Sequence, residues 1–244
     1  MTIVNEIIDG FTLKEQSIEL PNRLTMDKNE ILKLRNFGMD YSTPVKKSGR
    51  LGFPKIKPYL GEIPTNYVSF SDCKQCREYD ITCVTGFDYD YKLMKLSNYI
   101  ELYLPLLELF KCVCNPDFSM YADLGLAKQI SNKLKSHEVA YILQEHGIPI
   151  LPSITWSSPK SYLFCFEGFS KGGAVIVSTI GTLRNECSRM YFKNGFLEML
   201  KVLSPDSVIL YGDVNEDMQR WLPKELDIHH FSHYRFERAR KNGK

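Results

Sequence analysis

Residues 148–181 read IPILPSITWSSPKSYLFCFEGFSKGGAVIVSTIG and carry the clearest structural pattern of the chain. The runs 148–154 and 174–177 are apolar and do not alternate with polar residues, and glycine precedes each of them. Strands of this kind are typical of parallel sheets that are covered on both faces. Between the runs, Ser158 followed by Pro159 predicts the start of a helix. The stretch therefore predicts a strand, a helical crossover and a second, parallel strand.

The same pattern continues on both sides of this stretch. Apolar runs predict further strands at 81–87, 110–114 and 207–211, with a short one at 67–70. Apolar residues at helical spacing predict a helix over 93–107 that is kinked near Pro105. They also predict two helices between 126 and 147, with a break near Ser136, and a further helix from 192 that stops at Pro205. We expect an α/β fold with a mostly parallel sheet and covering helices.

Two closures of such a sheet are open, a barrel and a doubly wound sheet. The chain has no Gly-x-Gly-x-x-Gly turn after the first strand and no Walker lysine motif, which disfavours the nucleotide-binding forms of the open sheet. We therefore expect a barrel-like form, a partial or irregular TIM-type. We predict that the chain divides into three parts: an N-terminal helical segment and long basic loop or arm (1–65), an α/β core (66–225) and a basic and aromatic tail (226–244). Within the first part, a helix is predicted to begin at Asp27.

Composition indicates an ordinary soluble protein. The 244 residues include 25% charged side chains with a formal net charge of +2, which is unlike a polybasic nucleic-acid coat. The longest apolar runs are far shorter than the about 20 residues that span a bilayer, and the N-terminus, with Glu6 and Asp9, lacks the pattern of a signal peptide. We expect a cytoplasmic protein without a membrane partner.

Acidic and hydroxyl side chains follow the predicted strands. In either closure, the carboxyl ends of the strands form the site. Carboxylates there suit acid–base catalysis, a divalent cation, or polar recognition of a sugar or base, although residues after strands also cap helices. We predict catalytic roles for Asp117, Asp88 and Asp90, and substrate-binding roles for Ser119, Thr155, Trp156, Ser178, Tyr211 and Asp213, with Trp156 offering a stacking face.

Seven cysteines without an export signal indicate reduced thiols. Cys73-x-x-Cys76, with Cys83 after it, is half of a common zinc site, which Cys112 or Cys114 would have to complete. Because no second Cys-x-x-Cys follows, zinc is the less favoured interpretation of these three candidate ligands.

Basic residues gather in two places. The tail interleaves aromatic residues with Arg235, Arg238, Arg240 and Lys241, which predicts contacts with nucleic acid, although a solvated helix end explains the pattern equally well. A second set lies in the long loop, at Lys46, Lys47, Arg50, Lys55 and Lys57.

Several motifs resemble one family. They are Phe87-Asp88-Tyr89-Asp90, NPDFSMY at 115–121, GIPILPSITWS at 147–157, FCFEG at 164–168, VSTIG at 177–181 and LYG at 210–212. In this order they resemble the family called domain of unknown function 4417, from about Val84 to Asp213. The resemblance implies that the strand-end residues form one shared site, to which it adds Glu167 as a substrate-binding candidate where the family more often has Asp. It also implies a phage or mobile-element setting, and it names no substrate.

Three functions are consistent with these patterns. The first is a hydrolase or glycosidase that acts on a nucleotide or nucleic acid, with Asp117 as the base and Asp88 or Asp90 as the partner acid. The second is a non-catalytic module that binds a nucleotide or nucleic acid. The third is a phage interaction protein that engages a host or defence protein. We favour the enzyme, because acids, hydroxyls and a tryptophan gather at the strand ends.

Overall fold

The computed structural model describes residues 46–232. The predictions of a helix from Asp27 and of nucleic-acid contacts by Arg235, Arg238, Arg240 and Lys241 lie outside these residues.

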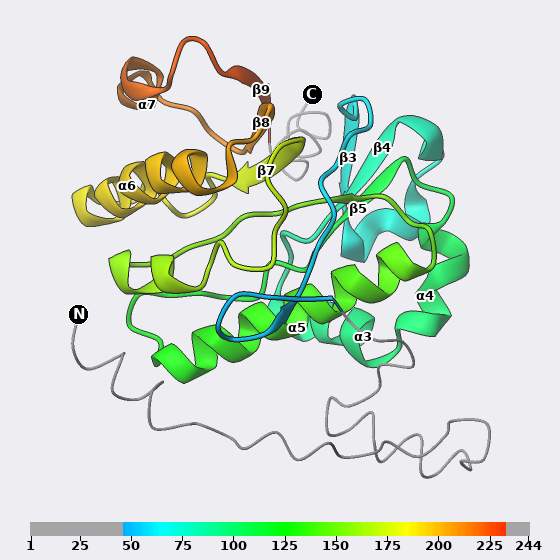
Figure 1. The fold of residues 1–244 in the computed structure, drawn as a ribbon. Helices are drawn as coiled ribbons and strands as arrows, with labels where there is room; N and C mark the ends of the chain where they lie inside the picture. Colours follow the sequence, from blue (N-terminus) through cyan, green and yellow to red (C-terminus); the bar gives the residue numbers. More distant parts are fainter. Residues whose placement is uncertain (1–45, 233–244) are drawn as a thin grey trace, which may run out of the picture. The chain divides into compact units, whose positions relative to one another are not determined.

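Seven strands form two parallel sheets in chain order (Figure 1). The first sheet contains β3 (Asn66–Ser69), β4 (Thr82–Thr85), β5 (Cys112–Cys114) and β6 (Ile150–Leu151), and the second contains β7 (Ala174–Ser178), β8 (Ser207–Tyr211) and β9 (Asp227–Phe231). A parallel bridge between Ser153 and Ile176 joins the two sheets. The expected α/β architecture with mostly parallel strands is confirmed.

Helices connect the strands. They are α3 (Asp90–Asn98), α4 (Ile100–Leu107), α5 (Leu126–Glu145), α6 (Glu186–Leu203) and α7 (Glu216–Trp221), with 3-10 helices η2 (Phe70–Gln75), η3 (Tyr79–Ile81) and η4 (Pro159–Leu163). A small antiparallel hairpin, β1 (Lys47–Ser48) and β2 (Phe53–Pro54), precedes them. In Figure 1, α3, α4 and α5 lie along β3–β6, and α6 and α7 lie beside β7–β9. No helix between residues 46 and 232 is long and apolar enough to cross a membrane.

Three local predictions were wrong. Helix α5 runs unbroken through Ser136, whose hydroxyl donates to the Pro116 carbonyl at 2.6 Å and begins no second helix. The break expected near Pro105 lies instead at Tyr99, between α3 and α4. Strand β9 was not predicted, because its half-exposed sequence DIHHF lacks an apolar run.

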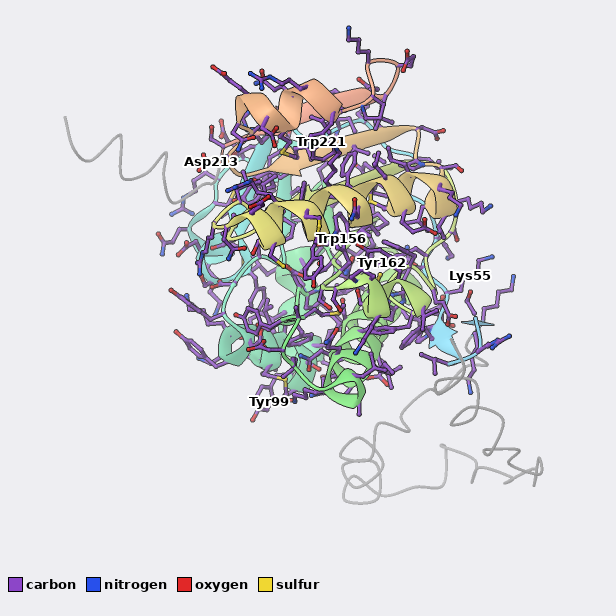
Figure 2. All side chains as sticks on the ribbon, turned by 90° about the vertical axis from the view of Figure 1, so that its left-hand side faces the viewer. Lys55, Tyr99, Trp156, Tyr162, Asp213 and Trp221 are labelled. Atoms are coloured by element: carbon purple, nitrogen blue, oxygen red, sulfur yellow. The ribbon has the colours of Figure 1, made fainter. Side chains whose placement is uncertain are left out.

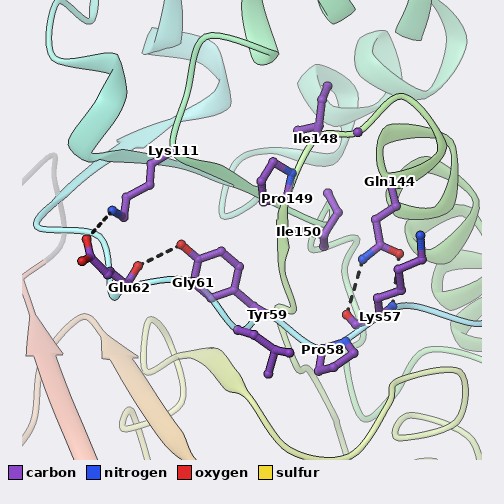
Figure 3. Close-up of a pocket in the computed structure, with 12 residues that line it drawn as sticks. Lys57, Pro58, Tyr59, Gly61, Glu62, Lys111, Gln144, Ile148, Pro149 and Ile150 are labelled. Carbon is purple, nitrogen blue, oxygen red and sulfur yellow. Dashed lines mark hydrogen bonds and ion pairs between the residues drawn. The ribbon is translucent and has the colours of Figure 1, made fainter.

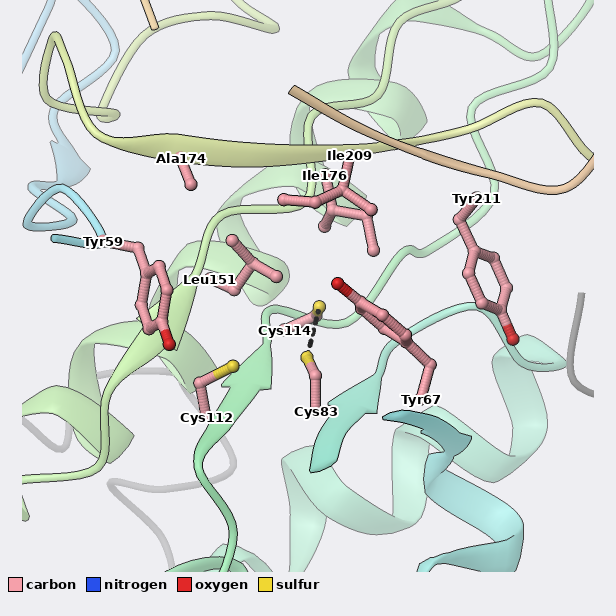
Figure 4. Close-up of a cluster of buried hydrophobic side chains, with 10 residues drawn as sticks. All are labelled: Tyr59, Tyr67, Cys83, Cys112, Cys114, Leu151, Ala174, Ile176, Ile209 and Tyr211. Atoms are coloured by element: carbon pink, nitrogen blue, oxygen red, sulfur yellow. Dashed lines mark hydrogen bonds between the residues drawn. The ribbon is translucent and has the colours of Figure 1, made fainter. Parts of the chain in front are cut away.

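A cluster of buried side chains fills the space between the two sheets (Figure 4). Every strand from β3 to β8 contributes, through Tyr67, Cys83, Cys112, Cys114, Leu151, Ala174, Ile176, Ile209 and Tyr211, and Tyr59 enters from the preceding segment. The ring of Tyr67 on β3 lies 4.6 Å from that of Phe231 on β9, measured between centroids. The first and last of the seven parallel strands therefore contact each other through their inward side chains.

Candidate functional site

The loop after β5 places Asp117 at the carboxyl ends of the strands. Gly86, just after β4, accepts a hydrogen bond from the Asp117 backbone amide at 3.0 Å. The amide side chain of Asn115 bonds to the backbone of Ser153 on both sides, donating at 3.0 Å and accepting at 2.7 Å. These contacts fix the ends of β4, β5 and β6 together. Thr155, two residues beyond Ser153, donates its hydroxyl to the Asp117 carboxylate.

A second carboxylate lies next to this pair. Oδ1 of Asp90, at the start of α3, accepts hydrogen bonds from the backbone amide and the hydroxyl of Ser119, at 3.1 and 3.0 Å. The negative charge of Asp90 raises the pKa of the Asp117 carboxyl. The structure therefore brings four predicted residues together, and we call Asp90, Asp117, Ser119 and Thr155 the acidic group.

Helix α5 covers the acidic group with a polar face. Its buried residues include Gln129, Asn132, Lys133, Ser136 and His137, which recur at helical spacing. Asn132 donates to the Ser119 carbonyl at 2.8 Å, and Gln129 donates to the carbonyl of Leu124 at 2.7 Å. These side chains replace apolar packing with hydrogen bonds to the loop that carries Asp117.

Lys133 is the cation of this face. Its side chain is only 5% exposed, and its Nζ lies 3.9 Å from the centre of the Phe169 ring. Among residues 46–232, it forms no ion pair with a carboxylate. One turn later, the imidazole of His137 contacts the Pro54 carbonyl at 2.9 Å through Nδ1, while its buried Nε2 has no partner. Our sequence interpretation missed both residues; the polar stripe along the helix was the available signal.

Burial moves the pKa values of Asp117 and Lys133 toward neutrality. Burial raises the pKa of Asp117 to about 6, although the Thr155 hydrogen bond and the charge of Lys133 oppose the rise. Burial likewise lowers the pKa of Lys133 to about 7, opposed by Cys165 and Asp117. Asp117 keeps part of its surface accessible to solvent. A carboxyl group whose pKa is raised toward neutral pH, on a residue that is partly exposed, is suited to proton transfer.

The remaining acidic candidates have other surroundings. Asp88 accepts hydrogen bonds from the amides of Ser71 and Tyr89 and pairs with Lys92 at 3.4 Å. Burial alone would raise the pKa of Asp88, but these contacts hold it below its usual value. Glu167 lies against Gly49 of the β1–β2 hairpin. Asp213 is exposed after β8, outside the acidic group.

The remaining polar and aromatic candidates make contacts with residues outside the acidic group. Trp156 packs below α6, where its indole N–H donates to the Tyr191 carbonyl at 3.1 Å (Figure 2). Tyr211 stacks on Phe87 with centroids 5.2 Å apart. The hydroxyl of Ser178 accepts from the Ile180 amide at 3.2 Å.

The cysteine candidates are not gathered at one point. Cys83 points into the core, where its sulfur lies 3.5 Å from that of Cys114, and Cys76 contacts the Thr82 hydroxyl at 3.6 Å. In the part of the chain that the structure describes, no three His, Cys, Asp or Glu side chains form a group that could hold a metal ion. The structure therefore does not unite Cys73, Cys76 and Cys83 as zinc ligands.

An open cavity of about 470 Å³ lies at the opposite ends of the strands (Figure 3). Its lining comes from 57–62, Lys111, Gln144 and 147–150, which precede β5 and β6. Lys111 and Glu62 within it pair with each other at 3.1 Å. Since active sites of parallel α/β folds lie at the carboxyl ends of the strands, we assign the candidate site to the acidic group.

Gly86 is expected to be essential for the position of Asp117. A Cβ on Gly86 would lie 2.3 Å from the Asn115 carbonyl oxygen and 3.0 Å from the Asp117 nitrogen, both of them backbone atoms. We expect Gly86→Ala to lower the free energy of unfolding by about 1–3 kcal/mol, measured by denaturant unfolding. Gly125→Ala is the control, because its Cβ would meet nothing within 4 Å. Equal losses in both variants would contradict the close approach at Gly86.

The family model described as Domain of unknown function (DUF4417) matches residues 45–232. The chain belongs to this family. The match confirms the resemblance and includes the acidic group and Lys133 of this DUF4417 domain.

The DUF4417 chain is also similar to two phage proteins. It is 28% identical over 174 residues to the Gene 1 protein of Mycobacterium phage D29, which covers 67% of this chain and 64% of that protein. It is 25% identical over 135 residues to the Gene 1 protein of Mycobacterium phage L5, which covers 55% and 59%. The chain thus spans less than two thirds of the length of these relatives. No solved structure matches it.

Proposed function

We propose that this DUF4417 protein is a phage or mobile-element hydrolase, in the broad sense that includes glycosidases, and that it acts on a nucleotide or nucleic acid with Asp117 as general base. The observation that carries the proposal is the carboxyl of Asp117, a partly exposed residue; Thr155 orients this carboxyl and burial raises its pKa to about 6. A base with such a pKa is largely ionised at neutral pH and still accepts a proton efficiently.

The proposed reaction consumes one water molecule. The Asp117 carboxylate takes a proton from water while the water oxygen forms a bond to the glycosidic carbon or phosphorus of the substrate. The bond from that atom to the leaving group then breaks, and the leaving group keeps the electron pair of this bond. The leaving group takes a proton from solvent, and Asp117 releases to solvent the proton that it took from water. Asp90 is a better partner carboxylate than Asp88, because Asp90 lies beside Asp117 in the acidic group, whereas Asp88 is engaged by Ser71, Tyr89 and Lys92.

The proposal includes a barrel-like fold of partial TIM type. Three observations support it: strands β3–β9 follow one another in chain order, their pairings are parallel, and Tyr67 on β3 meets Phe231 on β9. In such a fold, the loops after β4, β5 and β6 converge on one face, which is where the acidic group lies.

Product formation tests the proposal. Purified protein is incubated with nucleoside monophosphates, nucleoside triphosphates and oligonucleotides, and the products are separated by chromatography and weighed by mass spectrometry. We expect one substrate class to gain the mass of water or to be cleaved by the wild type and not by Asp117→Asn. The absence of product with every class, or equal product from the variant, would contradict the enzyme and favour a binding module or a protein that engages a host factor.

A further inference from the structure

Basic side chains gather on the β1–β2 hairpin and the extended segment that follows it. We call residues 46–57 the basic hairpin; its cations are Lys46, Lys47, Arg50, Lys55 and Lys57, and it contains no acidic residue. All five side chains are exposed, and within residues 46–232 none of them forms an ion pair. Because the whole chain has a formal net charge of only +2, the rest of it is net negative.

The hairpin sets like charges against each other. The Lys55 amide donates to the Lys46 carbonyl at 2.7 Å, so these two lysines lie opposite each other on neighbouring strands. Lys47 is the next residue and pairs with Pro54. Like charges directly opposite in a ribbon destabilise it. The arrangement is therefore unfavourable for folding, and an anionic partner would relieve the repulsion.

The backbone of the basic hairpin is firmly anchored. Ile56 is fully buried; its amide donates to the Gly168 carbonyl at 2.7 Å, and its carbonyl accepts from the Ser170 amide at 3.0 Å. The side chain of Gln144 accepts from the Lys57 amide at 3.1 Å and donates to the Lys57 carbonyl at 3.4 Å (Figure 3). Lys55 and Lys57, on either side of Ile56, are thus presented from an anchored backbone, which lowers the entropy lost when a partner binds.

The turn of the hairpin is closed by Glu167. Gly49 has a φ of +71°, and a Cβ there would lie 2.0 Å from Oε2 of Glu167. Burial raises the pKa of Glu167, against the opposing effect of the Leu51 and Arg50 amides and the Arg50 charge. Glu167 therefore packs against the turn, and the charged side chains that the basic hairpin exposes, including Lys55, which is labelled in Figure 2, are all cations.

We propose that the basic hairpin binds the phosphate backbone of a nucleic acid. Five cations spread along a two-stranded ribbon match a polymer with repeated phosphates better than a single nucleotide. The inference deepens the proposed function. It rests on that function for one point, which is that the polyanion is a nucleic acid. The hairpin packs on His137, one helical turn from Lys133, so it adjoins the helix that covers the acidic group.

Salt-dependent binding tests the inference. The full-length Asp117→Asn protein, which is not expected to turn over its substrate, is titrated against fluorescein-labelled single-stranded and duplex DNA of about 30 nucleotides. Fluorescence anisotropy gives Kd between about 50 and 200 mM salt. Five phosphate contacts predict that Gln at all five hairpin positions lowers the slope of log Kd against log salt by about 3.5 on single-stranded DNA and by about 4.5 on duplex DNA. The affinity at the lowest salt should fall at least about tenfold.

The matched control removes the same charge elsewhere. Gln replaces five exposed lysines outside the hairpin, namely Lys160, Lys171, Lys193, Lys201 and Lys224. The inference is overturned if this control loses as much affinity as the hairpin variant, if the hairpin variant binds as the parent does, or if the parent binds heparin but neither DNA. If binding depends on the hairpin but the wild type yields no product in the substrate screen, the proposed enzymatic function is overturned and the inference about the hairpin stands.

Discussion

Asp117→Asn is expected to abolish turnover and to leave the folded protein at least as stable as the wild type at pH 7. Removal of a general base lowers the rate by at least about 100-fold. Asparagine keeps an oxygen that accepts the Thr155 hydrogen bond, so the loop geometry is expected to persist. The two effects are measured as kcat/KM on the substrate found by product screening and as the free energy of unfolding in denaturant.

The stability half of this prediction follows from linkage. The folded-state pKa of Asp117 is raised to about 6 from a usual value of 3.8. The folded protein therefore holds this proton more tightly than the unfolded chain does, and stability is lost as the pH rises through this window. Above this pH window, the charged carboxylate costs at most about 3 kcal/mol. Asparagine removes this cost.

Asp88→Asn is the matched control for stability. Because its pKa is lowered, ionised Asp88 contributes stability that is present at neutral pH and lost as the pH falls through its folded pKa. We expect Asp88→Asn to lower the free energy of unfolding at pH 7. If Asp117→Asn were destabilised to the same degree, Asp117 would be a structural carboxylate and the proposed catalytic role would be wrong.

Lys133→Met is expected to move the acid limb of the pH–rate profile to higher pH. The charge of Lys133 lowers the pKa of Asp117, so its removal raises that pKa above about 6. Less of the base is then ionised at pH 6, and kcat/KM there should fall about fivefold if the limb moves by one pH unit. A profile of kcat/KM against pH for the wild type and the variant measures this displacement. Lys128→Met, an exposed lysine on the same helix, is the control.

The same variant is expected to be more stable below pH 7. The pKa of Lys133 is lowered to about 7 from 10.5. The free energy of unfolding of the wild type therefore rises as the pH increases from about 7 to 10.5, and below about pH 7 the full cost of burying the charged ammonium is present. Methionine has a similar length and no charge, and it should raise the free energy of unfolding by more than about 1 kcal/mol at pH 6. An unchanged pH profile together with reduced stability would contradict this role of Lys133.

Strand positions were predictable because buried parallel strands carry continuous apolar runs. Ala174–Ser178 and Ser207–Tyr211 lie almost where the sequence places them. The acidic group was partly predictable for the same reason, since the residues that follow such strands meet at one edge. Thus Asp117 and Thr155 lie 38 residues apart in the chain and share a hydrogen bond.

Helix α5 shows why the rest was not predictable. The apolar spacing of Leu126, Ile130 and Leu134 indicates their burial, yet all three are only partly buried. The helix instead buries Gln129, Asn132, Lys133, Ser136 and His137. The hydrogen bonds of Asn132, Ser136 and His137 go to carbonyl groups 13, 20 and 83 residues away, and the spacing of polar residues along the helix does not reveal these partners. Lys133 escaped notice because it enters the site from a helix and not from a strand end.

The titration of the Asp117 carboxyl carbon, followed by NMR in protein labelled with ¹³C at aspartate, tests the assignment of the site most directly. The Asp117→Asn variant identifies the resonance by its loss, and no substrate is needed. We predict a midpoint near pH 6 in the wild type and a higher midpoint in Lys133→Met. A midpoint near 4, the value of an ordinary solvated aspartate, would contradict the assignment of Asp117 as the acid–base group.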